Sequence, residues 1–336
     1  MIGLDEAGRL AAALAALERQ EVDSAEVFYV DSGSRDGSPE IARQHGVSAV
    51  LAIPRAGASA ARARNAGLER VSAPYVQFVD GDTVLEPGWA AEGVAALEAD
   101  AGLAGVEGGL VEARPDANLY HAVCELDWAV EPGPVPYVGG NSLYRTAALR
   151  EVGGFDPRMT VGEEPEIGAR LRARGWRLRH LDRRMACHDL DLASFADYWR
   201  RGIRGGLACG MVVRATGGSF AGVWHERLWR TLAHAALLVA PLALGLLVLP
   251  IAPLAGLMCA ALSPALFAVL TERKARTLVA AGLPPRVARA FGAHTYFGKL
   301  PAALGILVAS VRGWPAGEPP ACMRTDLRET DAPPPG

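Results

Sequence analysis

The first third of the chain alternates short apolar runs with longer amphipathic segments. Runs typical of buried strands cover residues 26–30, 49–53 and 75–79, and helix-like segments cover residues 10–17, 39–45 and 58–71. Strands that alternate with helices predict a parallel sheet with helices on both faces. Such sheets bind their ligands at the carboxyl ends of the strands. We therefore expect a site where these strands end.

The next part of the chain holds a helix with "EEPEIGARLRARG", a strand near Leu178 and an aromatic, basic helix, "FADYWRRGIRGG". Residues 232–270 then form a stretch of 39 residues without Asp, Glu, Lys or Arg. One membrane crossing needs about 20 apolar residues, so this stretch is long enough for two. Pro250 and Pro253 lie at its middle, where a turn would fall. We predict a transmembrane helical hairpin; the alternative is a buried hairpin of a soluble protein.

Basic residues follow the predicted hairpin. A loop over residues 272–290 is expected to carry Arg273, Lys274, Arg276, Arg286 and Arg289. The positive-inside rule places this loop, and everything before residue 231, in the cytoplasm. A third apolar segment, residues 291–311, either crosses the bilayer or lies in its interface. The Pro-rich, polar tail, residues 315–336, is predicted to be disordered.

The net charge and the cysteine content limit the classes of partner and site that we expect. The net charge is -3, which argues against nucleic acid, because proteins that bind the phosphate backbone normally carry a basic surface. Five widely spaced cysteines without a CxxC pair favour reduced thiols over a disulfide framework or a zinc site.

Two carboxylates end the third predicted strand, in "YVQFVDGDTVLEPGW". Asp80 and Asp82 are separated by Gly81 alone, and like charges this close repel unless a cation lies between them. Oxygen ligands suit a hard cation such as Mg²⁺ or Mn²⁺, and such a cation suits a diphosphate. Asp and Gly also crowd ordinary turns, so this motif alone is weak.

Three further stretches accompany the acidic turn: "VDSGSRDGS", "ARARNAGLERVSAPYVQFVDGD" and "YVGGNSLYRTAALREVGGFDP". The alternative for "VDSGSRDGS" is an Asp/Ser/Gly turn that satisfies its own backbone, and no stretch is specific by itself. Their order and spacing over residues 4–206 resemble the family 2 glycosyltransferases, which are inverting enzymes of GT-A fold. The resemblance implies an α/β, Rossmann-like GT-A domain that binds a nucleotide sugar, followed here by C-terminal transmembrane helices.

The resemblance also implies residue roles at the donor. Asp31 would bind the nucleobase and Asp36 would shape its pocket, while Arg64 would lie near the nucleotide. Asp80 would contact the ribose or the metal, and Asp82 would ligate the metal on the diphosphate. The sugar and acceptor side would be lined by Gly139, Gly140 and Asn141.

The catalytic base is expected at the start of the helix in "VGEEPEIGARLRARGW". This stretch resembles the family's Glu-Asp-x-Asp-Leu helix start, whose second acid takes a proton from the acceptor hydroxyl. That position is Glu164, and Glu163 is a possible substitute. The alternative is that these acids simply complement the helix dipole.

The roles of one histidine and of three arginines stay open. His188, in "ACHDLD", is either a further metal or diphosphate ligand or a surface histidine. Arg200, Arg201 and Arg204, in "YWRRGIRGG", contact the diphosphate or anionic lipid headgroups, or form a solvated face.

The start of the chain departs from the family pattern. Family members begin with a strand of the form Val-Ile-Pro-x-x-Asn-Glu, whereas this chain begins "MIGLDEAGRL", with Asp5 and Glu6 at the Asn-Glu positions. Nearly the whole first strand is therefore expected to be missing, which would leave unpaired backbone in the middle of the sheet. This predicts either a start assigned too far downstream or a damaged copy.

Together these observations predict a membrane-anchored, inverting glycosyltransferase. It would move a sugar from a nucleotide-diphosphate donor to a glycan or lipid-linked acceptor hydroxyl in cell-surface polysaccharide or glycolipid synthesis, with Mg²⁺ or Mn²⁺. The expected organisation is a cytoplasmic catalytic domain over residues 1–225 and a multi-pass inner-membrane region over 226–314. The alternatives are transfer to a polyprenyl phosphate and a catalytically inactive scaffold of the same fold.

Overall fold

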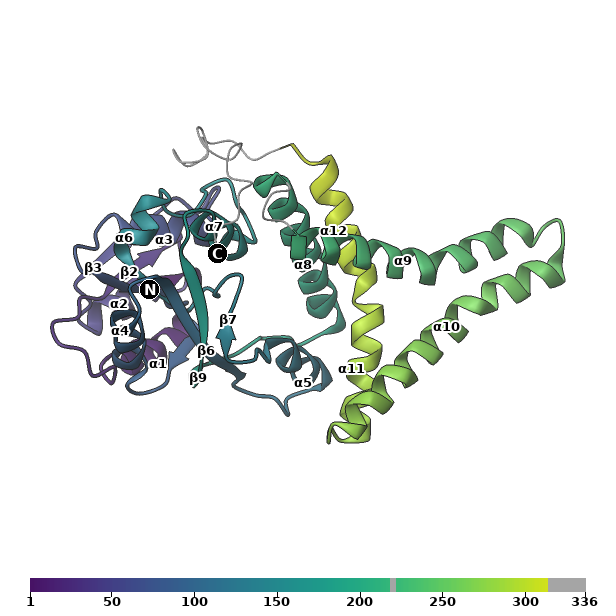
Figure 1. Cartoon of the computed structure of the whole chain (residues 1–336), viewed down its shortest axis with the longest axis horizontal. Helices are drawn as coiled ribbons and strands as arrows, with labels where there is room; N and C mark the ends of the chain where they lie inside the picture. The colour runs from purple at the N-terminus through teal and green to yellow at the C-terminus, as the bar shows by residue number, and fades with distance from the viewer. Residues whose placement is uncertain (218–221, 314–336) are drawn as a thin grey trace, which may run out of the picture.

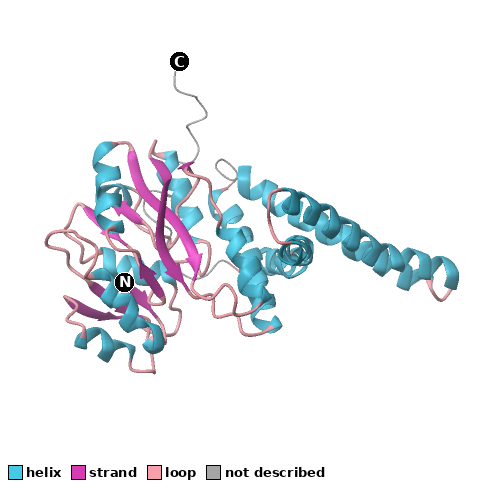
Figure 2. Ribbon diagram, turned by 90° about the horizontal axis from the view of Figure 1, so that it is seen from below, coloured by secondary structure: helices cyan, strands magenta, loops and turns pink. Residues whose placement is uncertain are grey.

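The computed structural model describes residues 1–217 and 222–313, so the predicted disordered tail lies outside the described residues. An α/β domain forms one side of the molecule and long helices form the other (Figure 1). Figure 2 shows the strands of the domain packed between helices, and a helical hairpin that extends away from them.

The N-terminal half of the domain is a parallel sheet in the order β1-β2-β3. Its strands are β1 (Ile2–Gly3), β2 (Phe28–Asp31) and β3 (Ala49–Ala52), joined by the helices α1 (Ala7–Leu17), α2 (Ser38–Gln44) and α3 (Ala60–Leu68). Leu10, Leu14 and Tyr29 are buried together between α1 and β2. The alternating apolar pattern therefore gives the predicted order of strands and helices here.

A two-residue strand, β1, occupies the place of the family's first strand. Ile2 pairs with Val30 of β2 and also bridges to Asp80, so β1 joins the two sheets. The Ile2 amide donates to the Val79 carbonyl at 3.0 Å, and the Met1 amino group donates to the Phe28 carbonyl at 2.8 Å. The expectation of unpaired backbone at this place is wrong, because these few residues satisfy both neighbours.

The second sheet is mixed, with the order β4-β8-β6-β9-β5. Its strands are β4 (Tyr75–Gln77), β5 (Thr83–Leu85), β6 (Leu103–Glu112), β8 (Leu143–Arg145) and β9 (Arg177–His188), and β7 (Gly133–Pro134) pairs with β9. Strands β6 and β9 are parallel, and the other neighbouring pairs are antiparallel. The prediction of a wholly parallel sheet is therefore wrong for this half of the domain.

Helices and one 3₁₀ turn connect the strands of the second sheet. They are α4 (Trp89–Ala99), α5 (Leu119–Glu125), the 3₁₀ turn η1 (Leu126–Trp128), α6 (Thr146–Glu151) and α7 (Glu163–Ala173). The main core between them contains Phe78, Tyr144 and Phe155, whose rings meet edge to face. This core holds the ends of β4 and β8, where the candidate residues lie.

The C-terminal part consists of α8 (Phe195–Thr216), α9 (Gly222–Val248), α10 (Pro253–Ala280), α11 (Pro285–Phe297) and α12 (Lys299–Val311). Helices α9 and α10 form the predicted hairpin, which points away from the α/β domain (Figure 1). Both are long and apolar enough to cross a membrane. At the tip, Leu247, Ile251 and Leu254 are 73%, 87% and 73% exposed.

The segments after the hairpin differ from the sequence expectation. Residues 272–290 are mostly helical rather than a loop, because α10 continues to Ala280 and α11 begins at Pro285. Glu272 of α10 pairs with Arg276 of its own helix and with Arg289 of α11, and the second pair ties the two helices together. The third apolar segment is broken at Gly298 into α11 and α12. Helix α12 packs closely along α8, where a Cβ on Gly206 would lie 1.9 Å from the Ala302 carbonyl oxygen.

Candidate active site

Arg64 of α3 connects three of the predicted site residues. Its Nη1 lies 2.8 Å from Glu163 Oε1 and 3.4 Å from Glu164 Oε1, and its Nη2 lies 3.0 Å from Asp80 Oδ1. The Arg64 side chain is 2% exposed. Burial alone would lower its pKa, but the three carboxylates outweigh burial and raise it. The guanidinium is therefore permanently charged, and it fixes the positions of the acids around it.

The turn before β8 is built to admit this guanidinium. A Cβ on Gly140 would lie 2.3 Å from Arg64 Nη2 and 3.1 Å from Glu164 Oε1. Next to it, the Asn141 side chain accepts a hydrogen bond from the Asp80 backbone amide at 2.8 Å. The turn predicted from "YVGGNS" thus meets both the acidic turn and the start of α7.

Glu164 stands at the first turn of α7, which begins after Gly162 in the left-handed conformation, with φ of 80°. Burial, together with the neighbouring charge of Glu163, raises the pKa of Glu164 to about 7, although Arg64 opposes the rise. A carboxylate with such a pKa can accept a proton near neutral pH. Glu163 is held more directly by Arg64. The next acid, Glu166, is buried in a 2.6 Å pair with Arg170 and so serves the fold.

Asp82 and His188 form a second contact, between the turn after β4 and the end of β9. Asp82 Oδ2 lies 3.2 Å from His188 Nε2. Burial favours the neutral form of each group, but their interaction dominates, so the pKa of Asp82 is lowered and that of His188 is raised. A carboxylate oxygen facing an imidazole nitrogen fits Mn²⁺ or a similar cation. Asp80 is drawn toward Arg64 instead, so two of the three predicted metal ligands meet directly.

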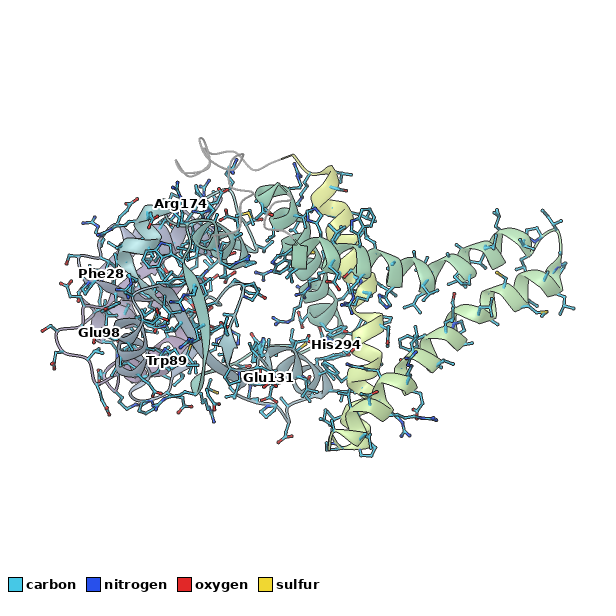
Figure 3. The ribbon with its side chains drawn as sticks, in the orientation of Figure 1. Phe28, Trp89, Glu98, Glu131, Arg174 and His294 are labelled. Carbon is cyan, nitrogen blue, oxygen red and sulfur yellow. The ribbon has the colours of Figure 1, made fainter. Side chains whose placement is uncertain are left out.

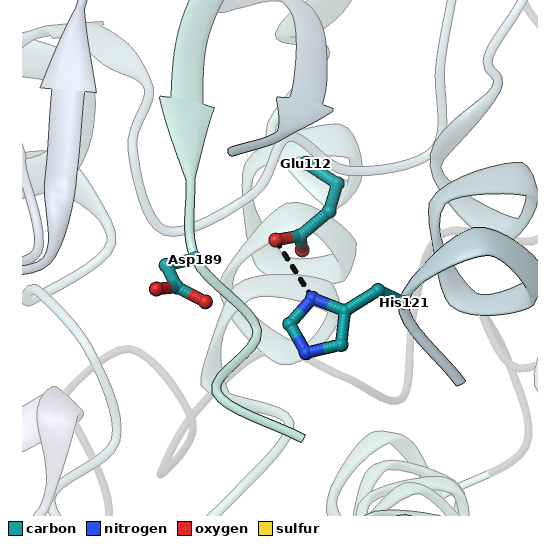
Figure 4. Close-up of side chains that lie close together, drawn as sticks. All are labelled: Glu112, His121 and Asp189. Carbon is teal, nitrogen blue, oxygen red and sulfur yellow. Dashed lines mark hydrogen bonds and ion pairs between the residues drawn. The ribbon is translucent and has the colours of Figure 1, made fainter. Parts of the chain in front are cut away.

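A tight group of metal-type ligands lies nearby, at Glu112, His121 and Asp189 (Figure 4). Its atoms already have partners. His121 Nδ1 lies 2.9 Å from Glu112 Oε1, and its Nε2 accepts from the Leu192 amide at 3.2 Å. Asp189 is paired with Arg114 at 2.7 Å. We infer that these side chains have a structural role and hold the segment after His188 in place.

The nucleotide residues predicted at the end of β2 have different roles in the structure. Asp31 Oδ2 accepts from the backbone amides of Gly33 and Ser34 at 2.9 Å. Its Oδ1 is buried and has no hydrogen-bond partner within the described residues, so it can accept a bond from a ligand. Asp36 uses both oxygens on the chain itself, at the Ser38 hydroxyl and the Ala7 amide. We interpret Asp36 as a structural residue that links the first residue of α1 to the first residue of α2.

The three candidate arginines of α8 are all exposed. Arg200 is 71% exposed and pairs with Asp197 of its own helix. Arg201 is one residue further along the helix and is also exposed. Arg204 is exposed on the same helix.

Several residues around the site were not predicted from the sequence. Glu107 of β6 accepts from the Gly139 amide at 2.7 Å, and its position within the apolar run "LAGVEGGLVE" was a usable signal. Glu6 packs over Gly81, and burial, followed by the charge of Asp82, raises its pKa to about 7. The Trp128 ring meets the His188 ring edge to face at 5.6 Å. Nothing in the local sequence indicates this last contact.

Comparison with known families agrees with this geometry. The model of glycosyl transferase family 2 matches residues 4–128, and that of glycosyl transferase family group 2 matches residues 75–271, more than half of the chain. The chain belongs to the family 2 glycosyltransferases.

Individual relatives are more distant. Pre-mycofactocin glycosyltransferases of two Mycobacterium tuberculosis strains are 31% identical to this chain in an alignment of 202 residues that covers 56% of the chain. The chain spans 42% of the length of these relatives. The solved mannosyltransferase PcManGT from Pyrobaculum calidifontis, in complex with GDP-Man and Mn²⁺, is 21% identical. It aligns with a TM-score of 0.59 over 91% of this chain and 85% of its own. This likeness establishes the GT-A-like fold.

Proposed function

We propose that this family 2 glycosyltransferase transfers a sugar with inversion from a nucleotide-diphosphate donor to an acceptor hydroxyl. The observation that carries the proposal is the buried Arg64, which holds Glu163 and Glu164 on one side and Asp80 on the other. An inverting transfer needs a base on the acceptor side and charged contacts on the donor side. The ion pairs of Arg64 fix the distance between Glu164 and Asp80, so the arrangement supports both the base and the donor contacts.

The donor would lie along the carboxyl ends of the strands. The unpartnered Asp31 oxygen supports nucleobase binding, and Asp80 supports contact with the ribose or the diphosphate. Asp82 and His188 would hold a divalent cation, Mg²⁺ or Mn²⁺. When bound, such a cation stabilises the negative charge of the departing diphosphate. The GDP-Man and Mn²⁺ named with the P. calidifontis mannosyltransferase are consistent with this donor class.

The acceptor step would use Glu164. Its carboxylate takes the proton of the acceptor hydroxyl while that oxygen bonds to the anomeric carbon. At the same time the bond from the anomeric carbon to the diphosphate oxygen breaks, and the electron pair leaves with the diphosphate. A base with a pKa of about 7 is suited to this transfer near neutral pH.

We also propose that the α9–α10 hairpin anchors the enzyme in the inner membrane, with the catalytic domain on the cytoplasmic face. The exposed apolar side chains along both helices support insertion into lipid. In this arrangement α11 and α12 lie at the membrane surface beside α8. The acceptor would then be a glycan or a lipid-linked molecule of cell-surface polysaccharide or glycolipid synthesis.

Replacement of the base tests the chemistry. Glu164→Gln should lower transfer at least a hundredfold while Mn²⁺-dependent binding of the donor is kept, since general-base catalysis contributes about 10²–10⁴-fold. Glu98→Gln is the matched control, because Glu98 is exposed on α4, which supplies none of the site residues described above (Figure 3). Transfer should be measured with a panel of nucleotide sugars.

A second acceptor class is tested in the same experiment. A polyprenyl phosphate attacks with an oxygen that is already anionic and needs no base. The exposed Arg201 and Arg204 of α8, which would bind its phosphate, support this candidate. Full activity of a Glu163→Gln, Glu164→Gln double variant would support it and would overturn the base assignment.

A further inference from the structure

A carboxylate of the second sheet holds the turn before β8, residues 139–141. Glu107 is on β6, which runs beside β9 through the domain (Figure 1). Its Oε2 accepts a hydrogen bond from the Gly139 backbone amide at 2.7 Å. Its Oε1 lies 3.3 Å from Nδ1 of His180, the residue that pairs with it on β9. The Glu107 side chain is 14% exposed, and both of its oxygens are engaged within the chain.

The contact between Glu107 and Gly139 is of a strong kind. Hydrogen bonds from a backbone amide to a carboxylate are shorter and roughly twice as strong as those between neutral groups. Gly139 has no side chain that could hold it by packing. The Glu107 carboxylate therefore fixes the first residue of the turn.

The next two residues of the turn contact the candidate catalytic groups. The Gly140 backbone lies so close to the Arg64 guanidinium that a Cβ there would overlap it. The Asn141 side chain accepts from the Asp80 amide at 2.8 Å. Three consecutive residues thus contact the Glu107 carboxylate, the guanidinium and the acidic turn in order. A shift at the first of them passes directly to Arg64.

The far end of the turn has a support of its own. Gln77 Nε2 donates to the Asn141 carbonyl at 2.7 Å, and Trp89 Nε1 donates to Gln77 Oε1 at 3.0 Å. Because Trp89 is fully buried, these bonds anchor the Asn141 end in the core. Loss of the Glu107 contact would release the other end alone, and the backbone between the two ends would move.

We propose that Glu107 is a positioning residue for the transfer reaction and acts through the turn at residues 139–141. By holding the Gly139 amide, it keeps the Gly140 backbone against Arg64. Arg64 in turn holds Glu164, the proposed base, at 3.4 Å. The inference rests on the proposed function, because it gives Glu107 a part in the same acceptor step. Glu107 acts without touching the substrate.

Substitutions at Glu107 separate its hydrogen bond from its charge. Glu107→Gln keeps an oxygen that can accept from the Gly139 amide and loses the charge. Glu107→Asp keeps the charge, but its shorter side chain withdraws the carboxylate from the amide. Glu107→Leu loses both. Val106→Ala is the stability control, because Val106 is the neighbouring residue on β6 and points the other way, into a core cluster with Leu97 and Leu103.

The first measurement is kcat/KM of sugar transfer. A misplacement of about 1 Å at an active site can cost on the order of a hundredfold. We therefore expect Glu107→Asp and Glu107→Leu to lower kcat/KM at least about tenfold, and Glu107→Gln to stay within about threefold of the wild type. Val106→Ala should lower the melting temperature and leave kcat/KM close to that of the wild type. Glu107→Asp carries the comparison alone if Glu107→Leu does not fold.

A pH profile separates positioning from a general loss of stability. The charged and titratable groups that act on Glu164 or face it are Glu163, Arg64, Asp80, Tyr137 and Tyr144. Arg64 is the cation among them and lowers the pKa of Glu164. If Arg64 is displaced, the acidic limb of kcat/KM should move to higher pH by roughly half a unit or more. We expect this in Glu107→Asp and Glu107→Leu, whereas Glu107→Gln and Val106→Ala should keep the wild-type limb.

Hydrogen exchange of the backbone over residues 137–142 reports on the turn without any substrate. This segment should exchange faster in Glu107→Asp than in Glu107→Gln. Equal kcat/KM in these two variants, or a lower melting temperature with an unmoved acidic limb in Glu107→Asp, would overturn the inference and leave the proposed function standing. A wild-type chain that transfers no sugar would instead overturn the proposed function, and this inference with it.

Discussion

At the residue scale, one buried guanidinium, that of Arg64, orders three carboxylates. Glu163, Glu164 and Asp80 come from segments far apart in the chain, and without Arg64 their mutual repulsion would separate them. Arginine suits this position because its planar fork can donate in several directions and stays charged when buried. The same ion pairs leave Glu164 only partly compensated, which is why its pKa lies near neutrality.

The raised pKa of Glu164 predicts a pH dependence. The carboxyl is raised from 4.5 to about 7 in the folded chain. Activity should therefore fall as the pH drops through about 7, since the base becomes protonated, and kcat/KM reports this pKa in the free enzyme. The free energy of unfolding changes in the opposite direction, because the folded chain holds the Glu164 proton more tightly than the unfolded chain. This stabilisation is complete below pH 4.5 and is lost as the pH rises through about 7.

The measurement is kcat/KM from pH 5 to 9 at saturating Mn²⁺. The residual activity of Glu164→Gln should lack the acidic limb of the wild-type profile. A limb of the same position in the variant would assign the titration to another group.

Residues with a motif were predictable, and residues that reach the site by packing were not. Asp82, Arg64 and Glu164 stand in short motifs, and the structure brings them to one region, although their roles stay predictions. Trp128 and Glu107 contact the site across separate elements. No local pattern encodes such contacts, because they depend on how β6, β9 and η1 are placed together.

At the scale of elements, the turn before β8 decides whether Arg64 can reach its partners. Gly140→Ala should displace the guanidinium, because the added Cβ would lie 2.3 Å from Nη2. We expect at least a tenfold loss of kcat/KM and a lower melting temperature. Activity assays and thermal unfolding would measure both.

The adjacent glycine provides the control. A Cβ on Gly139 would approach Glu107 Oε2 at 3.5 Å, an ordinary contact. Gly139→Ala should therefore change activity far less than Gly140→Ala. Equal effects of the two substitutions would mean that the close approach to Arg64 is not what matters.

Strands and helices with a regular local pattern of apolar residues were predicted well. Strands whose pairing joins residues far apart in the chain were predicted poorly. The runs at 26–30 and 49–53 become β2 and β3 of a parallel sheet. Strand direction in the second sheet follows from long-range pairing of three-residue strands such as β5 and β8, which carry little periodic signal. The charged stretch at 272–290 was expected to form a loop, but Glu272 instead pairs along and between helices α10 and α11.

At the scale of the whole molecule, the proposed membrane hairpin would set the orientation of the catalytic domain. If α9 and α10 span the bilayer, Arg276 at the end of α10 lies on the cytoplasmic side with the catalytic domain. A cysteine reporter at Arg276 should then resist an impermeant thiol reagent added to intact cells, and it should react after permeabilisation. A reporter at Ile251, 87% exposed at the hairpin tip, should react from outside and is the control. Labelling of the Arg276 reporter in intact cells would contradict the arrangement.

We propose that the acidic turn binds a cation, which in turn holds the donor diphosphate. The most direct measurement is calorimetric titration of a nucleotide-sugar panel into the wild-type chain and Asp82→Ala, each with and without Mn²⁺. We predict Mn²⁺-dependent binding of at least one donor by the wild type. In the variant this binding should be lost while the chain still unfolds cooperatively, since Asp82 lies in a turn and its side chain contacts His188 rather than the apolar core. Equal Mn²⁺-dependent affinity in both proteins would contradict the account.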